Sequence, residues 1–236
     1  MQSKLYLFSV FAAFAAASTT NSHHLPKQPS IIPAPYDSGK PMPCSPAREP
    51  KRFCFVQPGT APDRDDAAHI LDSFHKCNDG GTVVLDQSYL IGSPLDLTFL
   101  KHIDVVITGE IHFDASDVYY WAENSFKYDF QNQSVYWKWG GEDVNIYGDL
   151  SREKSVIDGH GQPYWEEIQT NKSVSKDFSY SGRGIVLRLC SDICILQLRR
   201  PMLFAFDGME GATMSNLRMR NSPHVRTKSH LTSRAY

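Results

Sequence analysis

The apolar positions after residue 51 first follow the period of a helix. Four of them recur at i, i+3, i+4 and i+7, the spacing that places side chains on one helix face: Ala67, Ile70, Leu71 and Phe74. Asp63 can cap this helix, which would put Asp65 and Asp66 in its first turn. The run Asn78-Asp79-Gly80-Gly81 ends it. We therefore predict one short helix, preceded by a short strand at Phe53-Cys54-Phe55-Val56.

After Gly81 the pattern changes to short segments of β-favouring residues. Gly, Asp, Pro and Ser separate four of them, which are Thr82–Leu85, Tyr89–Ile91, Val105–Thr108 and Ile111–Phe113. The segment Asp143–Gly148 resembles Asp104–Gly109, and Ala212–Asn221 is a looser third copy. Short strands with a drifting repeat predict a β-solenoid, in which each coil buries the face of its neighbour. An antiparallel sandwich is the alternative, although Asn-Gly hairpin signals between alternating runs are missing.

The first 50 residues follow neither pattern. Lys4 precedes an apolar run, Leu5 to Ala17, which ends in an Ala-x-Ala site, as in a cleaved secretory signal. The run is shorter than the roughly 20 residues that span a bilayer. We predict a signal peptide over residues 1–17, a secreted, extracellular protein and no membrane partner. Eight of the 14 prolines fall between Pro26 and Pro50, so residues 18–50 are predicted to be an exposed, extended arm. Residues 51–236 form the remaining domain.

Composition narrows the class of partner. Of the 236 residues 41% are hydrophobic and 12% aromatic, which is enough to build a core and argues against disorder. The net charge of −2 supplies no basic field for a nucleic acid. We expect no nucleic-acid partner, no cofactor, no bound metal and a monomeric protein. The pair His23-His24 is read as part of a solvated tail, because no further ligands accompany it.

Secretion makes the five cysteines candidates for disulfide bonds, and their odd number leaves one over: Cys44, Cys54, Cys77, Cys190 and Cys194. A bond between Cys54 and Cys77 would close a loop of about 24 residues and contribute about 3 kcal/mol. We predict this pair and leave the others open. Two sequons, Asn132-Gln133-Ser134 and Asn171-Lys172-Ser173, predict glycosylation at Asn132 and Asn171.

A series of longer motifs follows in order along the chain. They are Asp65–Ile70 and Cys77–Val84, Asn124–Phe126 with Phe130–Asn132, Gly140–Gly148, Val156–Trp165, Arg200–Phe204 and Met219–Pro223. Together they resemble the fungal exo-polygalacturonases of glycoside hydrolase family 28. The segment Val156–Trp165 resembles the Ile-Asp-Gly-x-Gly-Gln-x-x-Trp signature of that family. The resemblance covers about residues 52–180 and 200–223.

The resemblance implies a fold and a reaction. The fold would be all-β, a right-handed, single-stranded parallel β-helix of the pectin lyase-like type, with a short N-terminal capping helix. The reaction would be hydrolysis of terminal α-1,4-galacturonosyl bonds of polygalacturonate with inversion, so the expected partner is pectin or an oligogalacturonide. Inverting glycosidases hold two carboxyl groups roughly 6.5–9.5 Å apart, with a water between base and sugar.

The catalytic segments of the family are not found in their places. They are Asn-Thr-Asp-Gly-x-Asp, an Asp-Asp pair, Gly-His-Gly and Arg-x-Lys, the first shortly after the Asn-Ser-Pro coil. Here Asn221-Ser222-Pro223 is followed by residues 224–236 without them. Upstream, Gly159-His160-Gly161 is explained by a turn and Asp65-Asp66 by a helix N-terminus. We predict no catalytic residue and a truncated chain that is inactive as it stands.

Other readings stay open at this point. Residues 182–199 and 224–236 have no equivalent in the family, and we interpret them as aberrant reading of the gene. A non-catalytic β-helix that binds pectin or acts as an adhesin-like module is one alternative function. A rhamnogalacturonan hydrolase of the same family is another. The aromatic residues from Tyr119 to Trp139 are expected to be mostly core, in preference to a sugar-binding surface.

Overall fold

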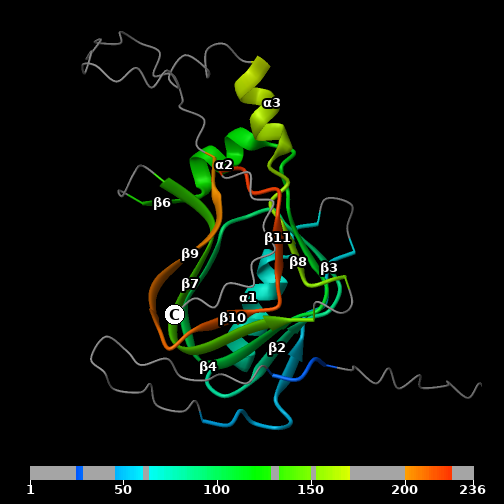
Figure 1. The fold of residues 1–236 in the computed structure, drawn as a ribbon, viewed down its shortest axis with the longest axis vertical. Coiled ribbons are helices and arrows are strands. Elements are labelled where there is room, and N and C mark those ends of the chain that lie inside the picture. Colours follow the sequence, from blue (N-terminus) through cyan, green and yellow to red (C-terminus); the bar gives the residue numbers. More distant parts are fainter. Residues whose placement is uncertain are drawn as a thin grey trace, which may run out of the picture.

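A computed structural model describes residues 25–28, 46–60, 64–128, 133–149, 153–170 and 200–224. Its strands lie in two sheets (Figure 1). The first sheet holds β1 (Phe53–Phe55), β2 (Thr82–Leu85), β4 (Leu95–Ile107), β7 (Gln133–Gly148) and β10 (Thr213–Ser215), with β6 (Phe126–Tyr128) and β9 (Met202–Glu210) also paired to β7. The second holds β3 (Ser88–Ile91), β5 (Glu110–Phe113), β8 (Val156–Asp158) and β11 (Arg218–Arg220).

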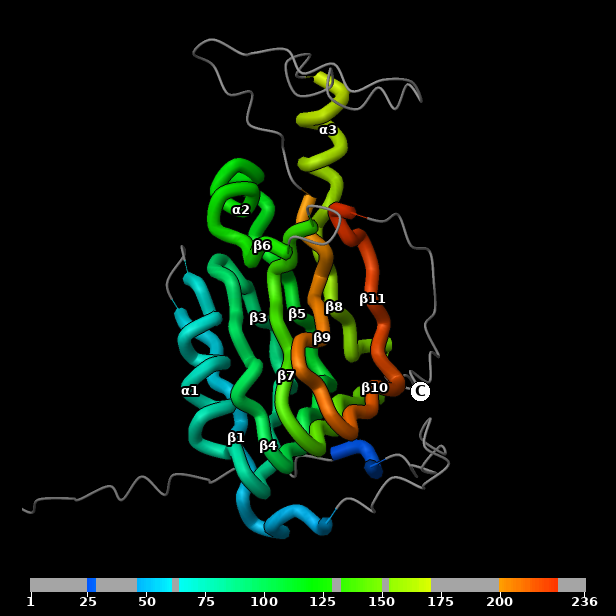
Figure 2. Tube along the Cα trace, turned by 90° about the vertical axis from the view of Figure 1, so that its left-hand side faces the viewer, coloured from blue at the N-terminus to red at the C-terminus, as the bar shows by residue number. Residues whose placement is uncertain are grey.

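The strand pairing is that of a parallel β-helix. All described pairs are parallel except β6 with β7, which is antiparallel. Apart from β6, each strand pairs with the equivalent strand of the next coil, so the coils stack in chain order (Figure 2). One rung of this stack aligns Thr82, Asp104, Asn145 and Thr213. The predicted β-helix is confirmed, and the sandwich alternative is wrong because hairpin pairing is confined to β6.

The long strands β4 and β7 each turn a corner of the coil. His102 in β4 has φ 46° and Asp143 in β7 has φ 55°, both in the left-handed region that non-glycine residues seldom adopt. The corner of the preceding coil is bonded to that of β4, with the Asp79 N–H donating to the Lys101 carbonyl at 2.8 Å. The Gly80 N–H donates to the His102 carbonyl at 2.7 Å. The corners are therefore stacked in the same way as the strands.

The register of the predicted repeat is wrong by two residues. The sequence likeness aligned Asp104 with Asp143, but in the structure Asp104 lies opposite Asn145 and Ile103 opposite Val144. A shift of two leaves every side chain on its expected face, because side chains alternate with a period of two. Alternation of apolar residues therefore predicted the faces correctly and could not fix the alignment.

The predicted helix exists but begins later. Helix α1 (Ala67–Cys77) has Asp66 as its N-cap residue, so Asp65 and Asp66 do not lie in the first turn; the expected cap, Asp63, is outside the described residues. Its buried residues Ala67, Ile70 and Phe74 face the core, and the helix contacts β1, β2 and β4. Two further helices, α2 (Val118–Asn124) and α3 (Gln162–Thr170), were not predicted.

Asp65 and Asp66 tie the start of α1 to the second coil. The Asp66 side chain is fully buried and accepts hydrogen bonds from the Gly59 N–H at 2.7 Å and the Leu90 N–H at 2.8 Å. Asp65 accepts from the Gly92 N–H at 2.8 Å. The pair therefore has a structural role beyond the helix-dipole role expected for it.

The aromatic stretch is core only in part: four of its described residues are buried, whereas Phe126 and Tyr128 are partly exposed. Trp121, Tyr136, Trp137 and Trp139 are at most 1% exposed. The ring of Tyr136 stacks on Phe113 at a centroid distance of 4.4 Å, and its hydroxyl donates to the Tyr164 hydroxyl at 2.9 Å. On α2, in contrast, Tyr119 and Tyr120 are 37% and 36% exposed.

Part of the N-terminal segment covers the outer face of the first sheet. Leu25 packs on an apolar patch formed by Val84, Val106 and Tyr147. The side chain of Arg48 is only 8% exposed. The prediction of an exposed arm is therefore wrong at Arg48, because carboxylates on the sheet bind it.

Several sequence predictions fall outside the described residues. These are the signal peptide over residues 1–17, the sequons at Asn132 and Asn171, the cysteines Cys44, Cys190 and Cys194, the atypical segment 182–199, and all of the atypical segment 224–236 except His224. In the part of the chain that the structure describes, no helix is both long and apolar enough to cross a membrane.

Candidate functional site

Two clusters of charged side chains lie on the outer faces of the coils. The first, the Arg48 cluster, consists of Arg48, His102, Asp104 and Asp143 on the first sheet. The second, the His160 cluster, consists of Glu110, His112, Asp158, His160, Arg220 and Asn221 on the second sheet. Each combines an arginine, histidine and carboxylates.

The Arg48 cluster is closed. Arg48 Nε donates to Asp104 Oδ1 at 2.8 Å, and Arg48 Nη1 donates to Asp143 Oδ2 at 2.8 Å. Asn145 Nδ2 donates to the same Asp104 oxygen at 2.9 Å, and His102 Nδ1 lies 2.5 Å from Asp143 Oδ2. Burial by itself lowers the pKa of Arg48, but the hydrogen bond to Asp143 and the charge of Asp104 outweigh it and raise the pKa. These contacts fix the N-terminal segment to the sheet.

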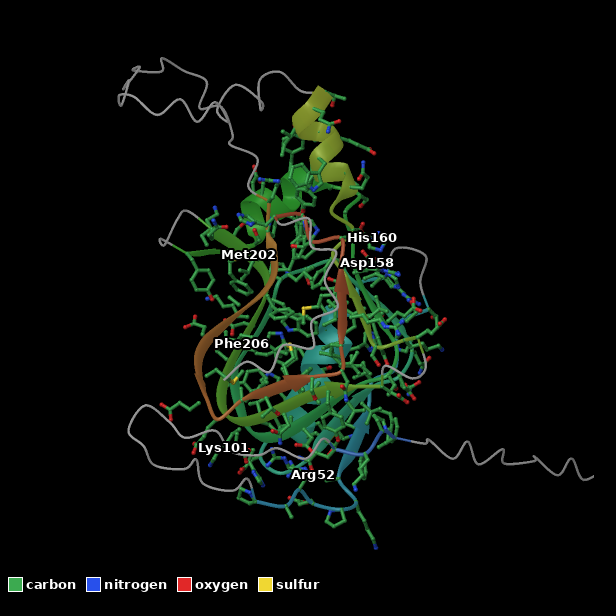
Figure 3. All side chains as sticks on the ribbon, viewed as in Figure 1. Arg52, Lys101, Asp158, His160, Met202 and Phe206 are labelled. Carbon is green, nitrogen blue, oxygen red and sulfur yellow. A yellow bond between two sulfur atoms is a disulfide. The ribbon has the colours of Figure 1, made fainter. Side chains whose placement is uncertain are left out.

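The His160 cluster is assembled by strand register. His112 of β5 lies opposite Asp158 of β8, and Asp158 lies opposite Arg220 of β11. His160 follows the end of β8 with φ 46°, between Gly159 and Gly161. Figure 3 shows Asp158 and His160 together at the end of β8. The side chain of Asp158 is 6% exposed, whereas that of His160 is 47% exposed.

Asp158 is held by three donors from two segments. Arg220 Nε donates to Asp158 Oδ2 at 2.6 Å, Asn221 Nδ2 to Oδ1 at 3.0 Å, and the His160 N–H to Oδ1 at 3.0 Å. Burial by itself raises the pKa of Asp158, but the His160 N–H, Asn221 and Arg220 outweigh it and lower the pKa. Asp158 is therefore an ionised acceptor, which is the opposite of what a general acid requires.

The two histidine rings of this cluster meet edge to face. His112 Nδ1 lies 3.0 Å from His160 Nε2, and His112 Nε2 lies 3.3 Å from Glu110 Oε2. One ligand atom each from His112, Asp158 and His160 lies within 4.8 Å of the others, a spacing that suits a metal ion. Among the described residues, this is the one group of three His, Cys, Asp or Glu side chains placed closely enough to hold an ion.

A third surface combines a cation with aromatic rings. Lys138 Nζ lies 4.6 Å from the ring centroid of Phe126 and 5.3 Å from that of Tyr128. Asp207 Oδ2 is 3.9 Å from the same ammonium group and accepts from the Tyr128 hydroxyl at 3.3 Å. Burial, followed by the charge of Asp207, raises the pKa of Tyr128 to about 12. We call these four residues the Lys138 surface. Phe206, 46% exposed, is adjacent to Asp207 in β9.

The structure brings together some of the residues named from the sequence and several that were not named. The structure joins Cys54 to Cys77 by a disulfide with a Cα–Cα distance of 6.0 Å, the pair named from the sequence. The segment Gly159-His160-Gly161 is a corner of the coil, as expected, but His160 also belongs to the His160 cluster. Arg48, His112 and Lys138 were not singled out. Their partners are distant in the sequence, so strand register is the signal that would have revealed them.

The geometry places the described chain in a definite class. Stacked parallel strands, corners in register and a helix over the first coil define a parallel β-helix protein. No family model matches the chain, and no solved structure matches it.

Named relatives match most of the chain. Exopolygalacturonase X-2 of Emericella nidulans is 37% identical over 198 residues, which is 84% of this chain and 38% of the relative. Exopolygalacturonase X-1 of the same organism is 39% identical over 186 residues, 78% of this chain and 35% of the relative. Exopolygalacturonase A of Aspergillus niger is 36% identical over 220 residues, 92% of this chain and 42% of the relative. The chain is similar over most of its length to these fungal exopolygalacturonases, and it spans about two fifths of the length of these relatives.

Proposed function

We propose that this chain provides framework coils of a pectin-degrading glycoside hydrolase, an exo-polygalacturonase that removes terminal galacturonosyl residues from polygalacturonate with inversion. The observation that carries the proposal is similarity over 84% of the chain to a protein named exopolygalacturonase. The aligned region includes coils that form the stacked parallel sheets. The apolar run from Leu5 to Ala17 supports the accompanying proposal of secretion.

We further propose that these 236 residues do not hydrolyse the substrate by themselves. An inverting pair needs two carboxyl groups with room for a water between them, one of them with a raised pKa. The buried carboxylates that the structure describes are engaged otherwise: Asp66 holds backbone N–H groups, Asp104 holds Arg48, and Asp158 holds Arg220. The family's Asn-Thr-Asp-Gly-x-Asp segment does not occur in the sequence.

The Lys138 surface is the proposed contact for the sugar chain. A galacturonosyl unit offers an apolar ring face and a carboxylate, and this surface offers two aromatic rings with an ammonium group over them. Asp207, 48% exposed at its side chain, pairs with Lys138 at 3.9 Å. A sugar carboxylate would replace this loose pairing with a charge-assisted hydrogen bond.

Two assays on the purified 236-residue chain test the function. No reducing ends should be released from polygalacturonate, and the chain should be retained on immobilised polygalacturonate more strongly than on dextran. Lys138→Gln should weaken this retention about tenfold, equivalent to about 1.4 kcal/mol. Lys101→Gln is the matched control, because Lys101 lies opposite Glu142 and its ammonium group is 4.0 Å from Asp79, outside the Lys138 surface (Figure 3 labels Lys101).

Each other outcome points to a different conclusion. Release of reducing ends would contradict the proposed absence of catalytic groups. Stronger retention on rhamnogalacturonan would favour the rhamnogalacturonan hydrolase alternative. Equal loss in Lys101→Gln and Lys138→Gln would show that bulk charge, not the Lys138 surface, holds the polymer. Equal retention on dextran and polygalacturonate would overturn the proposed substrate.

A further inference from the structure

We propose that His112, Asp158 and His160 form a binding site for a divalent transition-metal ion of the zinc class on the outer face of the second sheet. The ligand atoms would be His112 Nδ1, His160 Nε2 and Asp158 Oδ1, with water completing the coordination. The inference is independent of the proposed hydrolase function and of the Lys138 surface.

The distance between the two histidines carries the first step. Zinc binds histidine nitrogens at about 2.0–2.1 Å, so two such ligands at angles from about 90° to 110° lie about 2.9–3.4 Å apart. His112 Nδ1 and His160 Nε2 are 3.0 Å apart. The spacing of the two nitrogens therefore suits one shared ion, which both can bind once the half-exposed His160 ring turns its lone pair toward it.

The carboxylate supplies a third ligand with a small adjustment. Asp158 Oδ1 lies 3.9 Å from His160 Nε2. His160 is half-exposed and lies two residues beyond the end of β8, so its ring can approach the carboxylate without disturbing the sheet. Arg220 binds the other oxygen, Oδ2, at 2.6 Å. Asn221 Nδ2 lies 3.0 Å from Oδ1 and 3.2 Å from Oδ2, so it can leave Oδ1 to the ion and remain bonded to the carboxylate.

Outer contacts prepare the ligands for this role. A metal-binding histidine usually donates its other ring N–H to a carboxylate or carbonyl, which fixes the tautomer. His112 Nε2 lies 3.3 Å from Glu110 Oε2, so a proton on Nε2 leaves Nδ1 with its lone pair directed at His160. Ligating carboxylates are themselves hydrogen-bonded, as Asp158 is by Arg220 and Asn221.

The ligand set selects among ions. Two imidazoles and one carboxylate suit zinc, copper or nickel, whereas calcium prefers six to eight oxygen ligands. His160, 47% exposed, leaves the site open to an ion from solvent. Strand pairing holds His112 opposite Asp158, so two of the three ligands are fixed before the ion arrives.

Zinc binding at neutral pH, followed by equilibrium dialysis and calorimetry, tests the proposal. The intact chain should bind one zinc ion with its ligands in this cluster, and calcium should not compete. His112→Gln and His160→Gln should each weaken binding at least tenfold, and Glu110→Gln about tenfold to a hundredfold through the orientation of His112. Cobalt in place of zinc should give visible absorption bands that both histidine variants change.

Two controls separate this site from other histidines. His75→Gln alters an exposed ring that stacks on Phe99 and should leave zinc affinity unchanged. The double variant His23→Gln/His24→Gln, in the N-terminal segment, should also leave it unchanged. Circular dichroism establishes that each variant is folded.

Three results would overturn the proposal. The first is the absence of zinc binding by the folded chain, which would mean that His112 and His160 form only a hydrogen bond. The second is unchanged affinity in both His112→Gln and His160→Gln. The third is loss of binding in the His23→Gln/His24→Gln variant.

Discussion

The Arg48 cluster and the His160 cluster use the same residue types with different results. In the first, an arginine from the N-terminal segment covers the carboxylates, and its side chain is 8% exposed. In the second, Arg220 comes from the neighbouring strand and is 53% exposed. The histidine of the first cluster contacts a carboxylate already bound to arginine, whereas the two histidines of the second contact each other.

The difference shows that the role of a row of polar residues on a β-helix depends on whether a second segment of the chain covers it. A second segment laid over the row saturates its acceptors, and the row then stabilises the fold. A row without such a cover among the described residues keeps ring nitrogens that solvent can reach. Stability measurements should therefore separate the two clusters.

The largest effect is expected for Arg48→Ala. This change leaves Asp104 and Asp143 without their guanidinium partner, and removing one member of a buried ion pair costs about 3–5 kcal/mol. Chemical denaturation measures the loss in the free energy of unfolding. Adding Asp104→Asn to Arg48→Ala should restore part of the loss, since the amide carries no charge. A loss below about 1 kcal/mol would show that the cover is dispensable.

A smaller effect is expected for Leu25→Ala. Leu25 is half-buried on Val84, Val106 and Tyr147, so truncation should lower the free energy of unfolding by about 1–2 kcal/mol. Lys27→Ala is the control within the same segment, because Lys27 is exposed and its replacement should change the free energy by less than about 0.5 kcal/mol. Equal effects of the two changes would argue against specific packing of Leu25.

Arg220→Ala should cost less than about 1 kcal/mol. The Arg220 side chain is more than half exposed, so solvent screens the ion pair with Asp158. Asp158 also keeps its bonds from Asn221 and from the His160 N–H. Denaturation curves of Arg48→Ala and Arg220→Ala, recorded together, test the contrast directly. A cost for Arg220→Ala that equals the cost for Arg48→Ala would remove the distinction between the clusters.

The smallest effect is expected on the pH dependence of stability at acid pH. The pKa of Asp158 lies below its ordinary value of 3.8, so its stabilising contribution is present above that pH and is lost as the pH falls through the lowered pKa. At acid pH, the free energy of unfolding should fall less steeply with falling pH in Asp158→Asn than in the unchanged chain. The difference between the two slopes should correspond to less than one proton, because a single carboxyl is removed. Denaturant titrations over a pH series measure this slope. An unchanged slope would mean that Asp158 titrates alike in the folded and unfolded chain.

The sequence predicted the parts of the fold that depend on local pattern. The stripe at Ala67, Ile70 and Phe74 predicted α1, and the run Thr82–Leu85 is β2 residue for residue. Helices α2 and α3, of seven and nine residues, were missed because so few turns carry little periodic signal. The start of α1 was misplaced because Asp63, Asp65 and Asp66 are all suitable caps.

The sites were harder to predict because they depend on register. His112 and His160 are 48 positions apart, and Asp158 and Arg220 are 62 apart. The repeat suggested the coil but aligned it two residues out of place. An error of two residues keeps each side chain on its face but changes its partner, so the repeat predicted the face of Asp104 and not the residue that lies opposite it. The proline content of residues 18–50 predicted that Arg48 is exposed to solvent. Proline content carries no information about which charged residues form ion pairs.

The disulfide between Cys54 and Cys77 has a consequence for the order of folding. Helix α1 lies between β1 and β2 in the sequence, so β1 must pair with β2 across the helix. When this first strand pair forms, no completed coil is present for it to pack against. A covalent link between β1 and the end of α1 shortens the conformational search for this first pairing. Each later strand pairs with the coil before it, as in other solenoids whose repeats contact only their neighbours. We therefore expect the oxidised first coil to act as the template on which the remaining coils fold in succession.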